Sequence, residues 1–253
     1  MQKKVFVTGA GRGMGLETVQ RLLDFGFYLL AAARNLDTLL SLKERYGKNL
    51  ELVQLDLFDR GQIEQAGARL RKLSEEGAPL DVLIHNAGVY PGGKFPEHDV
   101  GRLMTVNFFA PLQLTRLALP AMAKGGRVLN ISSGLGRLSS FSPQAARALL
   151  EPLSIEEVET LARRYVKEGA MQGWPSDPYS VSKALLNALT RAFSTTYKDQ
   201  TFVSIDPGWV RTDMGGEGAP NSLEQGVETT IWAATTEVLE SNHFYHHRER
   251  VSW

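Results

Sequence analysis

The chain has 253 residues, of which 43% are hydrophobic and 22% are charged, values that are ordinary for a folded globular protein. Its 28 basic and 28 acidic residues cancel, which argues against nucleic acid or a membrane surface bound through bulk charge. The lack of cysteine excludes disulfides, thiolate metal sites and a cysteine nucleophile. Because the sequence shows neither a signal-peptide core nor a run of membrane-spanning length, we expect a cytoplasmic protein.

The first half alternates short apolar runs with stretches of helical period. The runs expected as strands are residues 5–7, 28–33, 50–55, 80–84 and 127–131. The stretches expected as helices cover residues 34 to about 46, 59–73 and about 100–123. Short apolar strands separated by helices are typical of βαβ units in a parallel sheet. The carboxyl ends of such strands border the ligand crevice.

The second half begins with a stretch that shows no strand from Gly136 to Pro178. Ser154 has the pattern of a helix N-cap with Glu157 at the third helical position, and Gly169 is a suitable end. A helix over 179–197, a strand over 201–205 and a helix over 222–235 are expected after it. No repeat or linker interrupts the chain. We therefore predict one doubly wound, Rossmann-type α/β domain over residues 1–253, with a mostly parallel sheet and a helical insertion at about 137–177.

A glycine-rich turn lies directly between the first strand and the first helix. Glycines there let the backbone approach a pyrophosphate, and the helix N-terminus offers N–H groups and a favourable dipole. A tight turn without a ligand is the alternative interpretation. The residues expected to contact a cofactor here are Thr8, Gly9, Gly11, Arg12, Gly13, Met14 and Gly15.

The end of the second strand indicates which cofactor binds. A site selective for NAD usually has a carboxylate there, whereas this strand ends in three alanines followed by Arg34. Arg34 and Arg12 together suit the 2′-phosphate of NADP, since guanidinium groups bind phosphate bidentately. The alternative is that both arginines are solvated surface residues. We favour NADP, used as NADPH.

Tyr179 and Lys183 are four residues apart, so they share one face of the expected helix. A phenol titrates near pH ~10, and a neighbouring ammonium group lowers its pKa, which suits a tyrosine for acid–base work at a carbonyl or alcohol oxygen. An ordinary surface pair is the alternative for this spacing alone. The glycine turn and Ser132-Ser133 at the end of a strand favour the chemical interpretation.

On these three features the chain resembles the short-chain dehydrogenase/reductase family, over essentially its whole length. Asn86-Ala87-Gly88 is similar to the family's Asn-Asn-Ala-Gly motif, except that His85 replaces the first asparagine. The resemblance implies further cofactor contacts from Asp56, Leu57, Asn86, Ala87, Gly88, Tyr179, Lys183, Pro207, Gly208, Val210 and Thr212.

The resemblance also implies the catalytic roles. Tyr179 would donate a proton to the carbonyl oxygen of a small ketone or aldehyde, and Ser133 would hydrogen-bond that oxygen. Lys183 would lower the pKa of the tyrosine and hold the nicotinamide ribose, and Asn107 would position a relay water. The residues expected at the substrate are Ser133, Trp174, Tyr179 and Trp209, although both tryptophans can also be core residues.

The distance between the serine and the tyrosine departs from most family members. Ser133 and Tyr179 are 46 residues apart, a layout similar to that of the monomeric NADPH-dependent carbonyl reductases. The insertion carries an apolar stripe at helical spacing, formed by Ile155, Val158, Leu161, Ala162 and Tyr165. If this stripe covers the family's usual dimer face, the protein is a monomer. A mobile lid over the substrate is the alternative.

The resulting prediction is an NADPH-dependent carbonyl reductase. The alternatives are a non-catalytic NADP sensor on the same fold and an isomerase or lyase acting on nucleotide sugars. His243, His246 and His247 lack partners at metal-ligand spacing, so we expect solvated histidines and no metal site.

Overall fold

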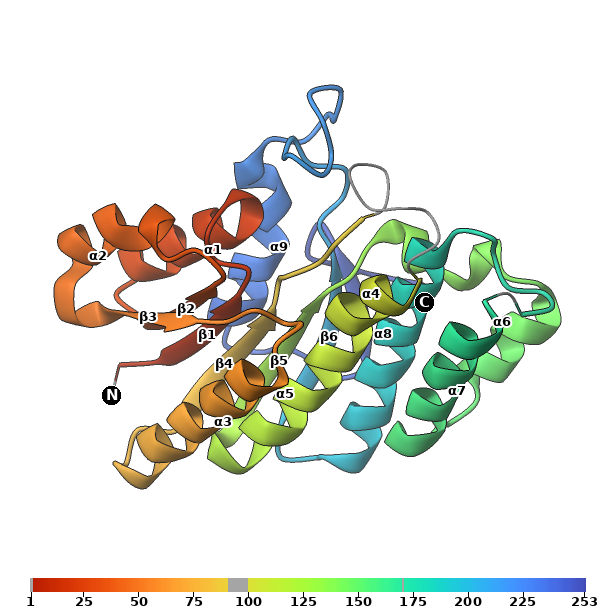
Figure 1. Ribbon diagram of the computed structural model, residues 1–253, viewed down its shortest axis with the longest axis horizontal. Helices are drawn as coiled ribbons and strands as arrows, with labels where there is room; N and C mark the ends of the chain where they lie inside the picture. Colours follow the sequence, from red (N-terminus) through yellow and green to blue (C-terminus); the bar gives the residue numbers. More distant parts are fainter. Residues whose placement is uncertain (1, 91–99, 170) are drawn as a thin grey trace.

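The computed structural model describes residues 2–90, 100–169 and 171–253 (Figure 1). An eight-stranded sheet crosses the molecule in the order β3-β2-β1-β4-β5-β6-β7-β8. Neighbours are parallel throughout, except that β8 runs antiparallel to β7. The strands are β1 (Lys4–Thr8), β2 (Tyr28–Ala33), β3 (Leu50–Gln54), β4 (Leu80–His85), β5 (Met122–Ile131), β6 (Thr201–Asp206), β7 (His243–His246) and β8 (Glu249–Val251).

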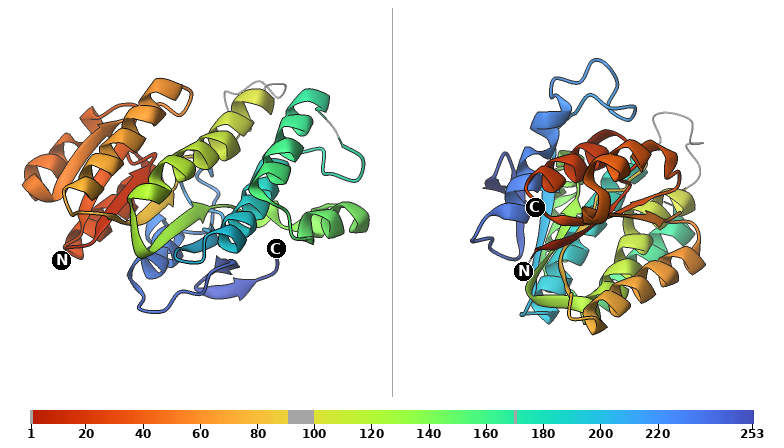
Figure 2. Two further views of the ribbon diagram at one scale, coloured as in Figure 1. Left: turned by 90° about the horizontal axis from the view of Figure 1, so that it is seen from below. Right: turned by 90° about the vertical axis from the view of Figure 1, so that its left-hand side faces the viewer.

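Helices cover both faces of the sheet, which confirms the predicted doubly wound fold in a single domain. One face carries α1 (Gly13–Asp24), α2 (Leu40–Tyr46) and α9 (Leu223–Thr235). The other carries α3 (Arg60–Glu75), α4 (Val100–Met104), α5 (Ala110–Ala118) and α8 (Pro178–Thr196). The insertion before α8 adds α6 (Pro143–Leu150) and α7 (Ile155–Glu168), and α7 packs along α8 (Figure 2). No helix among the described residues is both long and apolar enough to cross a bilayer.

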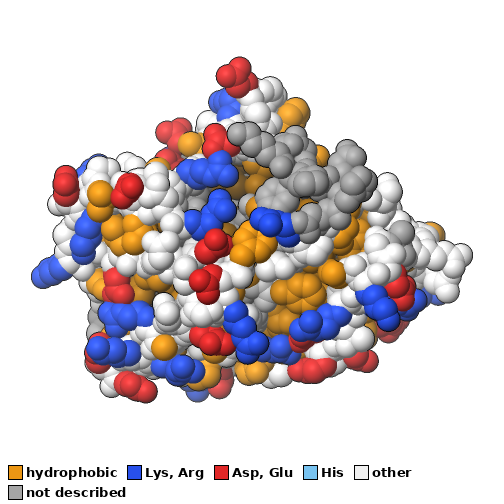
Figure 3. All heavy atoms as spheres, viewed as in Figure 1, with side chains coloured by type: hydrophobic (Ala, Val, Ile, Leu, Met, Phe, Trp, Pro, Cys, Tyr) orange, Lys and Arg blue, Asp and Glu red, His pale blue; other side chains and the backbone are white. Residues whose placement is uncertain are grey.

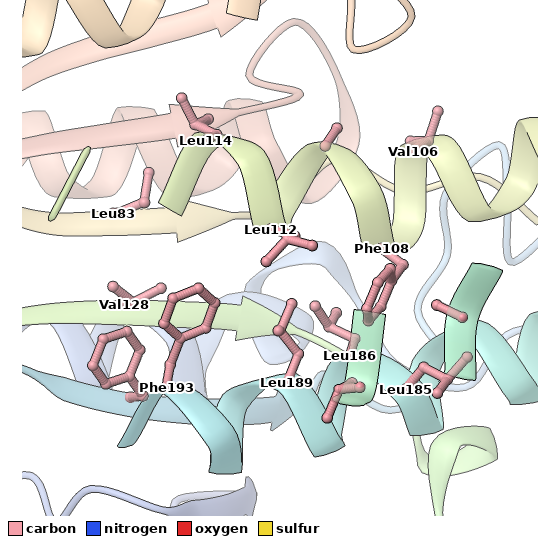
Figure 4. Packing of buried hydrophobic residues seen from close by; sticks show 14 of the residues in the cluster. Leu83, Val106, Phe108, Leu112, Leu114, Val128, Leu185, Leu186, Leu189 and Phe193 are labelled. Atoms are coloured by element: carbon pink, nitrogen blue, oxygen red, sulfur yellow. The ribbon is translucent and has the colours of Figure 1, made fainter. Parts of the chain in front are cut away.

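The central helix of the second face, α8, is buried on all sides. Every residue from Tyr179 to Thr190 is buried, because the sheet, α4 and α7 enclose the helix. Figure 4 shows Leu185 and Leu189 of α8 facing Phe108 and Leu112 on one side, with further contacts toward the strands. Burial of this many apolar side chains fixes α8 rigidly against the strand ends.

The segment from about 100 to 123 differs from the single helix that its pattern predicts. Pro120 lies in a 3-10 turn and has no N–H with which to continue an α-helix. β5 therefore begins at Met122, and the predicted helix end at Ala123 is wrong. The segment consists of α4, a π-helical turn over Thr105–Phe109, α5 and the 3-10 turn Leu119–Ala121.

The carboxyl-terminal strands β7 and β8 were not predicted from the sequence. β7 has only four residues and a histidine at each end, so it shows no apolar run. His243 and His246 are strand residues that keep part of their surface in solvent, and His247 is exposed, so of the three only His247 is as open as predicted. The described residues contain no group of three side chains that could hold a metal ion.

The inserted helix α7 has the ends that the sequence predicts. Ser154 and Glu157 form a reciprocal capping box, and Gly169 ends the helix at a φ of 74°. The predicted apolar stripe faces inward: Ile155, Val158, Ala162 and Tyr165 are buried and Leu161 is partly buried. The insertion also contains α6, which was not predicted; Ser142 caps it and Pro143 is its first residue.

His85, which departs from the family motif, is fully buried at the end of β4. Its ring nitrogen Nε2 lies 2.8 Å from Thr115 Oγ1 of α5. Burial lowers the pKa of His85 from 6.5 to about 3, because no charged partner compensates for the loss of water. The folded protein therefore holds this imidazole neutral at pH values where the unfolded chain binds a proton.

We predict that His85 makes the protein sensitive to mild acid. Because its pKa is lower in the folded state, stability is fully present above the unfolded pKa of 6.5 and is lost as the pH falls below it. At pH ~5 the loss amounts to about 2 kcal/mol. Denaturant unfolding of the wild type and of His85→Asn at pH ~7 and ~5 measures it. The wild type should lose about 2 kcal/mol more than the variant; an equal loss in both would contradict the prediction.

Candidate active site

The glycine turn after β1 is packed too tightly for side chains. A Cβ on Gly9 would lie 2.9 Å from the Cα of Ala87, and one on Gly15 would lie 2.1 Å from the carbonyl oxygen of Gly9. Gly9 and Gly13 also have φ values of 66° and 52°, in the region that favours glycine. Because α1 begins at Gly13 and Arg12 gives no side-chain cap, the first N–H groups of the helix face the turn unopposed.

Side chains at the end of β4 hold this turn in place. The amide of Asn86 donates hydrogen bonds to the carbonyl oxygens of Thr8 and Gly9, at 3.0 and 3.2 Å. The hydroxyl of Thr8 in turn accepts a 3.1 Å hydrogen bond from the N–H of Ala87. The predicted turn residues and the Asn-Ala-Gly motif are thus one hydrogen-bonded unit.

A cavity of about 550 Å³ opens beside this unit at the carboxyl edge of the sheet. In Figure 3, Lys and Arg side chains gather at the upper centre of the molecule. The predicted cofactor residues that line the cavity are Thr8, Gly9, Gly11, Arg12, Gly13, Met14, Gly15, Arg34, Asp56, Leu57, Asn86, Ala87, Gly88 and Thr212. The predicted residues outside its lining are Tyr179, Lys183, Pro207, Gly208 and Val210.

The cavity suits a phosphorylated dinucleotide. Arg12 and Arg34 both line it, and β2 ends without a carboxylate in Ala31–Ala33. Gly9 and Gly15 leave no room for a Cβ, so the backbone of the turn stays open to a pyrophosphate. Arg12 forms an ion pair with Asp213, a cavity residue that the sequence analysis missed. Asp213 comes directly after Thr212, one of the predicted cofactor residues, so its position could have indicated it.

The reacting groups lie where the first turns of α8 meet the end of β5. Asp177 caps the helix through hydrogen bonds from the N–H groups of Tyr179 and Ser180. The structure places the Ser133 hydroxyl close enough to the Tyr179 phenol to lower its pKa, despite their separation in sequence. The Nζ of Lys183 lies 5.6 Å from the centre of the Tyr179 ring and donates a 2.8 Å hydrogen bond to the carbonyl oxygen of Ile131.

Burial controls the protonation of these groups. Burial raises the pKa of Tyr179 to about 12, with smaller increases from Asp206, Asp177 and Tyr90 and a decrease from the nearby Ser133 hydroxyl. Burial also lowers the pKa of Lys183 to about 8. In the chain alone, loss of water therefore outweighs the lowering of the tyrosine pKa that we expected from Lys183. Tyr179 keeps its proton at neutral pH, as an acid must.

Asn107 lies in the π-helical turn between α4 and α5 and clamps the loop after β4. Its side chain accepts from the N–H of Val89 at 2.9 Å and donates to the carbonyl oxygen of Val89 and the hydroxyl of Ser182, both at 3.0 Å. The π-turn puts the Asn107 side chain out of helical register, a device common at functional sites. The amide oxygen of Asn107 and the Nζ of Lys183 each lie 3.5 Å from the Cβ position of Gly88. The relay water itself stays a prediction.

Comparison with known proteins identifies the family. A family model described as short chain dehydrogenase matches residues 3–145. Carbonyl reductase [NADPH] 1 of Pongo abelii is 34% identical over 250 residues, covering 90% of this chain and 89% of the relative. The chain belongs to the short-chain dehydrogenase family. Carbonyl reductase [NADPH] 1 of Homo sapiens is 32% identical, with the same coverage of both chains.

Solved structures share the fold. Salutaridine reductase from Papaver somniferum aligns with a TM-score of 0.85 at 22% identity, covering 96% of this chain and 99% of that one. A carbonyl reductase from Pseudomonas aeruginosa PAO1 in complex with NADP aligns with a TM-score of 0.71 at 26% identity over both whole chains.

The two tryptophans expected at the substrate have different surroundings in this short-chain dehydrogenase. Trp174 stacks on Tyr165 with ring centres 5.8 Å apart and touches Phe141, so it packs within the insertion. The side chain of Trp209 is 59% exposed and donates from Nε1 to the carbonyl oxygen of Gly215. Trp174 is thus packed in the insertion and Trp209 lies at the surface directly after Gly208, and a role of either at the substrate stays a prediction.

Tyr90 is a site residue that the sequence analysis missed. Its ring meets the ring of Tyr179 edge-on, with centres 4.9 Å apart and planes at 80°. The Asn107 clamp on Val89 holds Tyr90 in this position. Its place two residues after Gly88 was the available signal, because the carboxyl ends of neighbouring parallel strands meet at one edge.

Proposed function

We propose that this short-chain dehydrogenase is a cytoplasmic, monomeric reductase that uses NADPH to reduce ketones or aldehydes. The observation that carries the proposal is the placement of Ser133 and Lys183 beside the buried phenol of Tyr179. The relatives named carbonyl reductase [NADPH] support both the cofactor and the reaction. Consumption of NADPH with a panel of carbonyl compounds is the primary test, and a non-catalytic NADP sensor would give no turnover with any of them.

The protein's part in the reaction is to bind and polarise the carbonyl group. Bound NADPH supplies the hydride that the carbonyl carbon receives. Tyr179 gives its phenolic proton to the carbonyl oxygen, so that hydride and proton together produce the alcohol. Ser133 stabilises that oxygen with a second hydrogen bond as negative charge develops on it. Lys183 stays close enough to oppose the negative charge left on the phenol.

We predict that Tyr179→Phe lowers kcat by a factor of about 10² or more, because it keeps the ring and removes the proton. Binding of NADPH, followed by fluorescence titration, should stay within about twofold of the wild type. Tyr165→Phe is a matched control. Burial raises the pKa of Tyr165 to about 12 as well, but this residue lies in the insertion against Trp174. Near-normal turnover in Tyr179→Phe would refute its role as proton donor.

We predict that the enzyme prefers NADPH over NADH by about 10-fold or more, since a charge-assisted phosphate contact contributes on the order of 1.4 kcal/mol. Arg34→Asp should move the preference toward NADH, because it places a carboxylate at the end of β2, where ribose hydroxyls are bound in NAD enzymes. Values of kcat/KM for both cofactors check this. Equal values in the wild type would rule out selection by Arg12 and Arg34.

We predict a monomer of 28.0 kDa at micromolar concentration, since α7 lies on the face of α8 through which relatives would pair. The support is the burial of Val158, Ala162 and Tyr165 of α7 within the same core cluster as α8. Sedimentation velocity gives the mass. A stable dimer joined through α8 would overturn the covering role of the insertion.

A further inference from the structure

Two side chains with formal charge are buried at the reacting end of the site. Among the described Asp, Glu, Lys and Arg residues, only Lys183 and Asp206 are buried. The mechanism above uses Lys183, whereas Asp206 has no part in it. Asp206 ends β6, next to the strand β5 that leads to Ser133. Burying a carboxylate is costly, so its position calls for a reason.

The Asp206 carboxylate joins the two turns that flank the reacting groups. Its Oδ1 accepts a 3.0 Å hydrogen bond from the N–H of Gly208, at the start of the turn after β6. Its Oδ2 would lie 2.8 Å from a Cβ on Gly134, so it touches the backbone directly after Ser133. Any larger residue at position 134 would displace the carboxylate or the serine turn.

The positive groups near this carboxylate neutralise it only in part. Arg137 Nη2 lies 3.7 Å from Oδ2, and His246 Nδ1 lies 3.4 Å from it. Both distances exceed those of a close charge-assisted hydrogen bond, and the histidine is positive only when protonated. A negative charge that is buried and incompletely paired acts strongly on its neighbours, because little water screens it.

We propose that Asp206 is a positioning residue for this reaction, which holds the Ser133 turn against the Gly208 turn and keeps a fixed negative charge that opposes phenolate formation on Tyr179. The inference rests on the proposed function. Asp206 acts through Tyr179 and Ser133. Its charge keeps Tyr179 in the acid form, which favours carbonyl reduction over alcohol oxidation.

The electrostatics around Tyr179 agree with this role. The Asp206 charge raises the pKa of Tyr179. Only burial and the nearby Ser133 hydroxyl affect this pKa more strongly. The titratable and charged groups around the pair are Lys183, Asp177 and Tyr90 near Tyr179, and Arg137 and His246 near Asp206, with the ring of His247 beside that of His246. Lys183 and Arg137 oppose the Asp206 charge, whereas Asp177 acts in the same direction as Asp206.

The decisive experiment is Asp206→Asn, which keeps an acceptor for Gly208 and removes the charge. The pH dependence of kcat is measured for ketone reduction and for oxidation of the corresponding alcohol. In Asp206→Asn, the pH at which reduction falls should be lower than in the wild type by about 0.5 or more. The pH at which alcohol oxidation rises should be lower by the same amount. The KM for NADPH should stay within about twofold, because Asp206 does not line the cofactor cavity.

A direct titration separates this inference from the proposed function. Phenolate absorbance of the wild type minus that of Tyr179→Phe reports the Tyr179 pKa without any turnover, and the same difference in the Asp206→Asn background should appear at lower pH. If the wild type reduces no carbonyl compound, the proposed function fails while this titration still tests the electrostatic role.

Two further variants serve as controls. Asp81→Asn removes a carboxylate that accepts from the N–H of Lys4 near the amino-terminal ends of β1 and β4, away from the reacting groups. It should leave both pH profiles unchanged. Arg137→Gln removes a counter-charge and should displace the profiles to higher pH, which keeps the test available if Asp206→Asn does not fold. A lower kcat without any displacement along the pH axis in either site variant would overturn the inference.

Discussion

The reacting groups are fixed by the burial of α8 on all sides. The helix lies between α4, α7 and the sheet, so it can neither rotate nor slide without opening the larger of the two apolar clusters. Tyr179 and Lys183 occupy its first turns and point to the end of β5, where Ser133 lies. The chemistry thus depends on a packing constraint that is spread over many apolar residues, none of which needs to touch a substrate.

The same burial sets the protonation of the polar groups that it encloses. Loss of water favours the neutral form of any acid or base, so the pKa of Tyr179 rises while those of Lys183 and His85 fall. For Tyr179 this preserves the proton that the reaction uses. For His85 it has no chemical benefit at the site, and its consequence is a cost in stability at acid pH. One physical effect thus supports catalysis in one place and limits stability in another.

The insertion contributes by completing the packing around α8. Its capping box and apolar stripe make α7 a self-contained amphipathic helix whose buried side faces α8. Trp174, stacked on Tyr165, belongs to this packing. Arg137, at the start of the insertion, reaches back to Asp206, so the segment also contributes charge next to the reacting end.

The sequence by itself determined the parallel sheet, the glycine turn, the helix that carries Tyr179 and Lys183, and the caps of α7, because these depend on local pattern and backbone chemistry. It did not predict β7, whose four residues form a strand only because β6 offers an unpaired edge. It also placed the end of the helix before β5 two residues too late, although Pro120, which has no N–H to continue the helix, was a local signal for that end. Tyr90, Asp213 and Asp206 acquire their roles from partners far away in the chain, at Tyr179, Arg12 and Gly134. Such contacts are decided by tertiary structure, because only the folded sheet brings the carboxyl ends of separate strands to one edge.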